Sequence, residues 1–141
     1  MNYKSIKFSR TNQAEFISDL RKRVKGYFDS NEISVHGNSA MFAKTAAMFL
    51  MYFGPYALML AGVVTQPWLV LLMWAIMGFG MSGIGLSIMH DANHGSYSNN
   101  KTVNKYMSYV MNLIGASSFN WKIQHNVLHH SYTNIEGVDE D

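Results

Sequence analysis

The histidines of this chain gather in one window, and their spacing makes them the residues best suited to chemistry. Five of the six lie between positions 90 and 130. They form two groups, His90 with His94 and His125 with His129 and His130. Residues four apart on a helix lie about one turn apart on the same face, with roughly 6 Å between their Cβ atoms. Each group is therefore predicted to direct at least two imidazoles into one small volume.

These imidazoles are predicted to bind a metal. Imidazole is neutral near pH 7 and is the commonest nitrogen ligand for iron, copper and zinc. The chain has no cysteine, which excludes a thiolate site, and no HExxH motif, which excludes the zinc-protease arrangement. Clustered nitrogen ligands beside a carboxylate suit a non-haem iron centre that binds dioxygen. The alternative is a non-enzymatic membrane protein that binds haem or a transition metal through these histidines.

Two apolar runs before the histidines have the length of membrane-spanning helices. Residues 45–64 contain no charged side chain. A helix of that length, at about 1.5 Å per residue, spans about 30 Å, which is the thickness of the hydrocarbon core of a bilayer. A second uncharged run covers residues 68–89, after a break that contains Pro67. Two such runs in succession predict a transmembrane helical hairpin rather than a buried hairpin of a soluble domain.

The distribution of positive charge predicts how this hairpin is oriented. Eight of the eleven Lys and Arg residues precede Thr45, none lies between the two runs, and three follow the second. Positive charge accumulates on the cytoplasmic side of membrane proteins. The N-terminus and the histidines are therefore predicted to face the cytoplasm. The net charge of +2 is too small to indicate a nucleic acid partner.

Residues 1–40 are predicted to form a cytoplasmic segment that contains an amphipathic helix. Apolar residues from Phe16 to Phe28 recur at helical spacing beside a cluster of basic residues. The apolar side of this helix either packs on its own protein or lies on anionic lipid headgroups, and the sequence leaves both alternatives open.

Two more helices are predicted after the second apolar run. Residues 101–118 carry a one-sided apolar stripe, with Asn104 and Ser108 on the polar side. This pattern predicts a helix at the membrane interface or packed across the bundle. Asn120 is then predicted to cap a helix that runs through Trp121 to His130.

Residues 78–83 fit the GxGxxG pattern of dinucleotide-binding loops. That pattern requires a preceding strand, whereas here it lies inside an apolar helical run. Close packing of a neighbouring helix against small residues is the better explanation.

The histidine groups resemble the histidine boxes of membrane fatty acid desaturases. Residues 90–96 (HDANHGS) match the first box, and residues 121–134 contain the second, which has the form HxxxHH. Both are most similar to the boxes of front-end acyl-lipid or acyl-CoA desaturases. The resemblance implies an all-α integral membrane protein, with residues 41–141 as the N-terminal part of a desaturase domain. The family's second hairpin and third histidine box are expected to lie outside these residues, so the 141 residues alone are expected to have little or no activity.

The resemblance also implies a cofactor and ligands. The complete enzyme would hold two non-haem iron ions and use O2 as co-substrate to introduce a cis double bond into an acyl chain. The implied ligands are His90, His94, His125, His129 and His130. No catalytic residue beyond these ligands and no further cofactor site is implied. Asp91, Asn93 and Asn126 are expected to orient the imidazoles by hydrogen bonds to them.

The resemblance implies three kinds of partner. The substrate would be a fatty acyl chain carried by CoA or by a phospholipid, and it would reach the histidines from the lipid bilayer. The sequence has no HPGG motif of a fused cytochrome b5 domain. Electrons are therefore expected to come from a separate donor such as ferredoxin or cytochrome b5.

Overall fold

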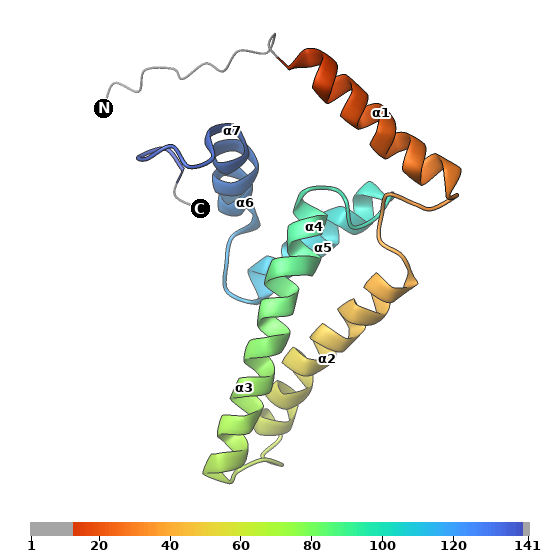
Figure 1. Cartoon of the computed structure of the whole chain (residues 1–141). Helices are drawn as coiled ribbons and strands as arrows, with labels where there is room; N and C mark the ends of the chain where they lie inside the picture. Colours follow the sequence, from red (N-terminus) through yellow and green to blue (C-terminus); the bar gives the residue numbers. More distant parts are fainter. Residues whose placement is uncertain (1–12, 140–141) are drawn as a thin grey trace. The chain divides into compact units, whose positions relative to one another are not determined.

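The computed structural model describes residues 13–139, which form helices and no strand (Figure 1). The all-α class is confirmed. The elements are α1 (Ala14–Ser30), α2 (Ser39–Leu60), α3 (Pro67–Gly83), η1 (Ile84–Met89), α4 (His90–Asn93), α5 (Lys101–Leu113), α6 (Ser118–Trp121), η2 (Lys122–His129) and α7 (His130–Tyr132). The segments η1 and η2 are π-helical. A boundary between Val35 and His36 divides the chain into two compact units.

The first unit contains α1, a helix within the segment where the sequence predicts one. None of its residues is buried. Two ion pairs on its exposed surface each join residues one helical turn apart. They are Arg23 with Asp19 at 2.7 Å and Lys25 with Asp29 at 2.6 Å. Whether its apolar side covers protein or lipid stays a prediction.

The second unit is built on α2 and α3, which pack against each other and are joined by a short turn (Figure 1). The contact is close at two glycines of α3. A Cβ at Gly80 would lie 2.8 Å from the backbone nitrogen of Tyr52, and one at Gly83 would overlap the side chain of Met48. Gly78 faces open space. The predicted packing against small residues is therefore confirmed at Gly80 and Gly83.

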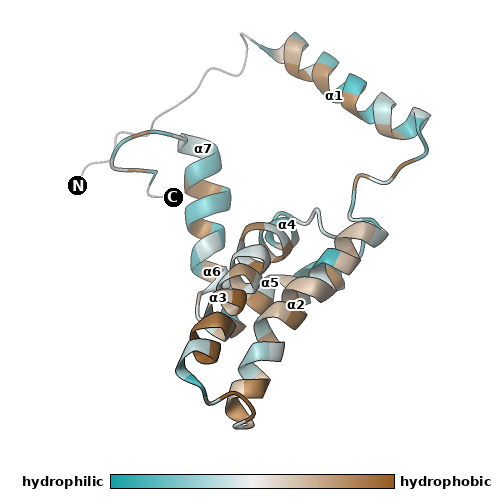
Figure 2. Cartoon of the chain, turned by 60° about the horizontal axis from the view of Figure 1, so that its bottom comes forward, coloured by the Kyte–Doolittle hydropathy of each residue, from teal (hydrophilic) through white to brown (hydrophobic). Residues whose placement is uncertain are grey.

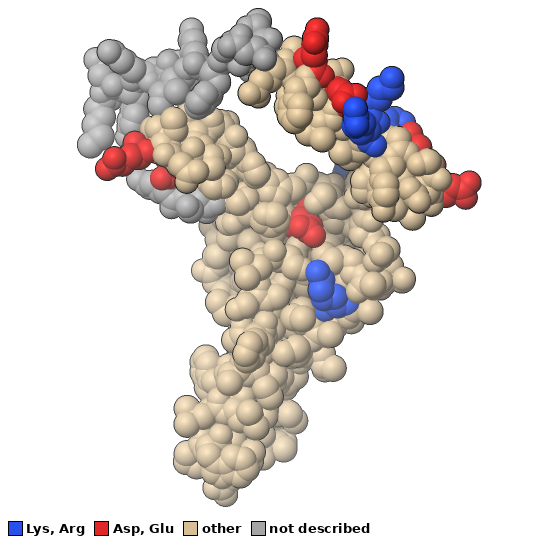
Figure 3. Space-filling view, in the orientation of Figure 1, with Lys and Arg blue, Asp and Glu red and all other residues tan. Residues whose placement is uncertain are grey.

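Among the described helices, one is long and apolar enough to cross a membrane. It is the continuous helix Pro67–Asn93, formed by α3, η1 and α4. Within the described residues, only 17% of its apolar window is buried. Figure 2 shows the apolar character of α3, and Figure 3 shows no charged side chain at the end of the hairpin on the face drawn.

The bounds of α2 differ from the predicted span over residues 45–64. The helix begins at Ser39, because the Asn38 side chain accepts a hydrogen bond from the backbone nitrogen of Met41, and it includes Lys44. It ends at Leu60, before Gly62 at φ +69°. About 24 Å of helix remains within the uncharged run, at 1.5 Å per residue. A transmembrane hairpin therefore stays a prediction.

The core of the second unit lies where α2, η1, α4 and α5 meet. Its buried members are Ile84, Ile88, Ala92, Tyr97 and Val110. Tyr97 is 2% exposed, and its hydroxyl lies 2.9 Å from the Oγ1 of Thr45 on α2. The core therefore connects α2 to the turn that follows α4.

The apolar stripe predicted over residues 101–118 faces the core in part, because Val110 is buried and Val103, Met107 and Ile114 pack against the core. The helix α5 ends at Leu113, and it buries Asn104 and Ser108 from the predicted polar side. Tyr106 and Leu113, from the apolar stripe, are 65% and 69% exposed. Asn104 is buried because its side chain bonds the turn after α4, and Ser108 is small enough to pack closely and bonds the carbonyl of Lys105.

The last helix is continuous from Ser118 to Tyr132 and comprises α6, η2 and α7. The predicted cap at Asn120 is wrong. Ser117 is the cap, because its backbone is extended and its side chain accepts a hydrogen bond from the backbone nitrogen of Asn120.

Candidate metal centre

The first histidine group lies at the end of the long helix, and the core fixes its position. The π-helical turn η1 leads directly into α4, which contains His90. Such turns inside α-helices occur frequently at functional sites. The helix ends after Asn93, and Gly95 adopts φ +76°, a conformation that glycine tolerates.

The turn after α4 is held by Asn104 of α5. Its Nδ2 donates hydrogen bonds to the carbonyls of Gly95 at 3.0 Å and Ser98 at 2.7 Å. Its Oδ1 accepts one from the backbone nitrogen of Ser98 at 2.8 Å. One buried amide therefore satisfies three backbone groups, which fixes the turn that begins at His94.

The second group lies on the helix of η2 and α7, which meets the first histidine group through ring contacts and a hydrogen bond. The Nδ2 of Asn126 donates a hydrogen bond to the backbone carbonyl of Asn93 at 3.2 Å. No residue of η2 or α7 is buried. The position of this helix therefore depends on few contacts.

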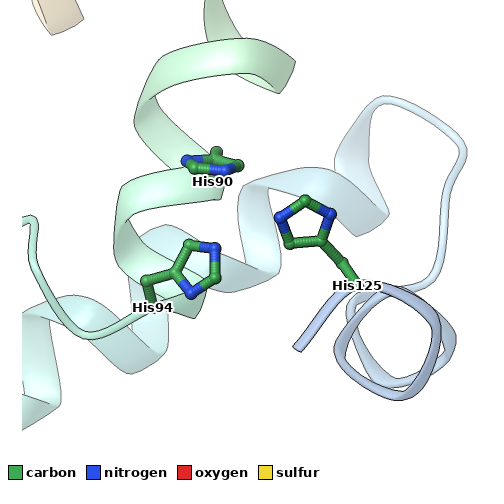
Figure 4. A group of neighbouring side chains, drawn as sticks. All are labelled: His90, His94 and His125. Carbon is green, nitrogen blue, oxygen red and sulfur yellow. The ribbon is translucent and has the colours of Figure 1, made fainter. Parts of the chain in front are cut away.

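The two groups converge (Figure 4). His90, His94 and His125 each offer a nitrogen within 4.8 Å of the others. The ring of His130 lies 4.9 Å from the rings of His94 and His125, centroid to centroid. His129 stacks on His125 at 5.2 Å and an interplanar angle of 18°. The structure thus gathers all five predicted ligands in one place, although their role in binding stays a prediction.

The donor set fits a transition metal. Metal–imidazole bonds are about 2.1 Å long, so two nitrogens on one ion are at most about 4.2 Å apart. The nitrogens of His90, His94 and His125 lie within 4.8 Å of one another, so small rotations of these side chains would bring them within bonding distance of one ion. Partial burial, and then the neighbouring rings of His90, His130 and His125, lower the pKa of His94 below its usual 6.5, against an opposing effect of Asp91. A lowered pKa keeps this imidazole neutral at pH 7, and the neutral form is the one that binds metal.

Two carboxylates contact the cluster. The Nδ1 of His90 lies 3.1 Å from Asp91, one of the predicted second-shell residues. The Nδ1 of His129 lies 3.1 Å from both carboxylate oxygens of Asp139, whose side chain is only 6% exposed. A carboxylate at one ring nitrogen leaves the other nitrogen available to a metal. Sequence reasoning missed Asp139, because its distance of ten residues from His129 matches no helical period.

Sequence reasoning also assigned no role to Trp121. Its ring stacks on His125 at 4.3 Å and 19°, and meets the rings of His90 and His94 edge-on at 5.6 Å each. The only available signal was its spacing of four residues from His125. The indole therefore fixes the plane of one imidazole and packs against two others.

Asn93 and Asn126 connect the two helices. Among residues 13–139, the Asn126 side chain donates a hydrogen bond to a backbone carbonyl and the Asn93 side chain donates one to the sulfur of Met89, and neither bonds an imidazole. Each also has a buried Oδ1 with no hydrogen-bond partner among the described residues. A role in orienting the imidazoles stays a prediction for this pair.

Comparison with known proteins decides the family. The family model for fatty acid desaturases matches residues 66–141, which include both histidine groups. The chain belongs to the fatty acid desaturase family. The non-enzymatic alternative is therefore disfavoured, because desaturases are oxidoreductases.

Several curated desaturases are similar over most of this chain. It is 40% identical over 124 residues to an sn-1 linoleoyl-lipid 6-desaturase of Arthrospira platensis, covering 88% of this chain and 33% of that protein. It is 36% identical over 138 residues to an acyl-lipid (8-3)-desaturase of Physcomitrium patens, covering 97% and 28%. An sn-1 linoleoyl-lipid 6-desaturase of Synechocystis sp. is 35% identical over 134 residues, covering 95% and 36%. The chain thus spans about a third of the length of these relatives. No solved structure matches this chain.

Proposed function

We propose that the full-length protein is a membrane-bound fatty acid desaturase and that this chain supplies five of its metal ligands. The observation that carries the proposal is the convergence of His90 and His94 with His125, from two helices that are far apart in sequence. His129 and His130 complete the set. The names of the similar proteins support an acyl chain as substrate.

The proposed cofactor is a pair of non-haem iron ions. When bound, they would supply dioxygen chemistry that removes one hydrogen from each of two neighbouring methylenes, leaving a cis double bond, while two electrons and two further protons complete the reduction of O2 to two water molecules. The electrons come from a separate ferredoxin or cytochrome b5. The 141 residues alone are proposed to be inactive, because the family's third histidine box is not among them.

The residues of this chain have defined tasks in that reaction. Asp91 and Asp139 accept the Nδ1 protons of His90 and His129, which directs the opposite nitrogens to the metal. Trp121 holds the plane of an imidazole. The helix Pro67–Asn93 places this centre at the end of an apolar segment of spanning length. An acyl chain would therefore reach it from the bilayer, and we propose the cytoplasmic face of a bacterial inner membrane.

The proposal is tested by expressing the full-length gene in a host without polyunsaturated lipids and profiling its fatty acids. We expect a new unsaturated species, and none with His94→Ala. Iron should be present at two ions per chain without a Soret absorption band. Folded, iron-loaded protein that forms no new double bond would overturn the proposal, and a Soret band would instead support the haem-binding alternative.

A further inference from the structure

A polar hollow opens on the side of the metal centre where α5 begins. Its volume is about 530 Å³, and His94 forms part of its lining. Three lysines also line it, Lys101 and Lys105 from α5 and Lys122 from η2. We call this site the lysine hollow and define it by these four residues. It lies outside the cluster of candidate ligands except at His94.

The charges that line the lysine hollow have one sign. No aspartate or glutamate lines it, and none of its lysines forms an ion pair with a carboxylate of residues 13–139. These three are also the only Lys or Arg residues that follow Lys44 in the whole sequence. The helices α5 and η2 thus bring every Lys and Arg that follows Lys44 to one hollow. A site with three lysines and no carboxylate favours an anion with more than one negative charge.

The helix α5 adds to this preference. Lys101 is the first residue of α5, and no acidic residue lies in the first turn. Positive side chains at this end are unfavourable, because the helix macrodipole is already positive there. A bound anion would relieve that repulsion. The arrangement costs stability in the unliganded protein and stabilises the complex.

The position of the lysine hollow relates it to the reaction. The apolar helix Pro67–Asn93 ends immediately before His94, so the hollow begins where the apolar segment stops. An amphiphile whose tail lies along the apolar segment would place its polar group in the hollow. The part of the acyl chain near its carboxyl end would then lie beside the metal centre.

We propose that the lysine hollow binds a phosphate group of the molecule that carries the acyl chain. This inference rests on the proposed function and narrows its substrate to a phosphate-bearing carrier. Phosphate is common to acyl-CoA and to phospholipids, and a galactolipid lacks it. The ammonium groups neutralise the phosphate, and the contact fixes how far the acyl chain extends past His94.

The test compares charge variants of the full-length, metal-loaded protein in detergent micelles, without O2 or electron donor. The variant carries Lys101→Gln, Lys105→Gln and Lys122→Gln together. Lys44→Gln, at an exposed lysine of α2 outside the hollow, is the matched control. A second variant with arginine at the same three positions keeps the charge. The probes are coenzyme A, a short-chain phosphatidylglycerol, inorganic phosphate and a short-chain galactosyl diacylglycerol, with dissociation constants measured by calorimetry.

We expect the triple glutamine variant to weaken binding of coenzyme A, phosphatidylglycerol or both by about ten-fold or more. Lys44→Gln and the arginine variant should stay within about two-fold of the original protein, and binding of the galactolipid should not respond to the lysines. Loss for coenzyme A alone assigns the hollow to acyl-CoA, and loss for phosphatidylglycerol alone assigns it to phospholipid.

Three results would overturn the proposal. One is unchanged affinity of the triple glutamine variant for both carriers, including the case in which only inorganic phosphate binding depends on the lysines. The second is an equal loss with Lys44→Gln, and the third is an equal loss for the galactolipid. Because the binding is measured without turnover, these results differ from a failure of the proposed function. Protein that binds phosphate through the lysines but forms no double bond would contradict the desaturase assignment alone.

Discussion

The two histidine groups are supported in different ways. Beneath the first lie the buried side chains of Ile84, Ile88 and Ala92, and the turn that follows it is bonded at three points by Asn104. Residues 122–132, which carry the second, contain no buried side chain. Their helix is held by Asn126, by ring contacts among histidines and Trp121, and by Asp139.

This difference suggests how the centre is assembled. Folding of the hydrophobic core sets the position of His90 and His94. The second group has little apolar contact to set its own position, so bound metal would hold it against the first. Metal binding and local order are then coupled, because a ligand that binds one arrangement stabilises it.

The largest expected effect tests whether metal binding requires both histidine groups in spite of this difference. His94→Ala and His125→Ala should each weaken Co²⁺ binding by about 100-fold or more, because losing a direct ligand costs more than losing a residue that only orients one. Calorimetric titration measures this. His36→Ala changes the one histidine outside the two groups and should leave the affinity within about two-fold. Equal affinity of His125→Ala and the original protein would remove the second group from the centre.

The next largest effect concerns the core below the first group. Ile88 is fully buried, and Ile88→Ala should lower the free energy of unfolding by about 3 kcal/mol. Val127 on η2 is 54% exposed, and Val127→Ala should change the free energy of unfolding by less than about 0.5 kcal/mol. Denaturant titration in detergent compares the two variants. Similar losses would contradict the difference in support between the two groups.

A smaller effect separates the two carboxylates. Asp139→Asn should weaken Co²⁺ binding by about ten-fold, because it weakens the contact that orients His129. Asp91→Asn should have less effect, since the Asp91 side chain is 40% exposed, compared with 6% for Asp139. Glu136→Gln, at an exposed neighbour of Asp139, is the control and should have none. A larger loss for Asp91→Asn would reverse the expected order.

The smallest effect tests the link between α2 and the turn after the first group. Tyr97→Phe removes the contact with Thr45 and should lower the free energy of unfolding by about 1 kcal/mol. Tyr106→Phe changes a tyrosine that is 65% exposed and should leave stability unchanged. Thermal unfolding monitored by circular dichroism measures both. Equal stability of the two variants would show that the hydroxyl of Tyr97 contributes nothing.

Helical periodicity explains what the sequence predicted correctly. His90 and His94 are four residues apart, and their rings lie 4.6 Å apart in the structure. The all-α class followed from the long apolar runs and the one-sided patterns. The glycines in the apolar run indicated close helix contact, and Gly80 and Gly83 provide it.

Other features depend on tertiary contacts that no local pattern encodes. The sequence pattern places Asn104 and Ser108 on the solvent side of a helix, yet their hydrogen bonds allow both to be buried. Asp139 reaches His129 through a turn that local spacing does not predict. The end of α2 was placed too late because hydropathy continues through Gly62, where the backbone turns.

The wide turn of η1 constrains how the chain can change in length. A π-helical turn accommodates more residues than an α-helical turn, and one residue corresponds to a rotation of about 100° around an α-helix axis. Deleting a single residue between Ile84 and Met89 would therefore let η1 tighten to an α-helical turn with His90 and His94 still facing His125. A deletion in the α-helical part of α3 would instead rotate the residues before it by about 100° relative to both histidines. The π-helical turn is thus the place where this helix tolerates the loss of one residue.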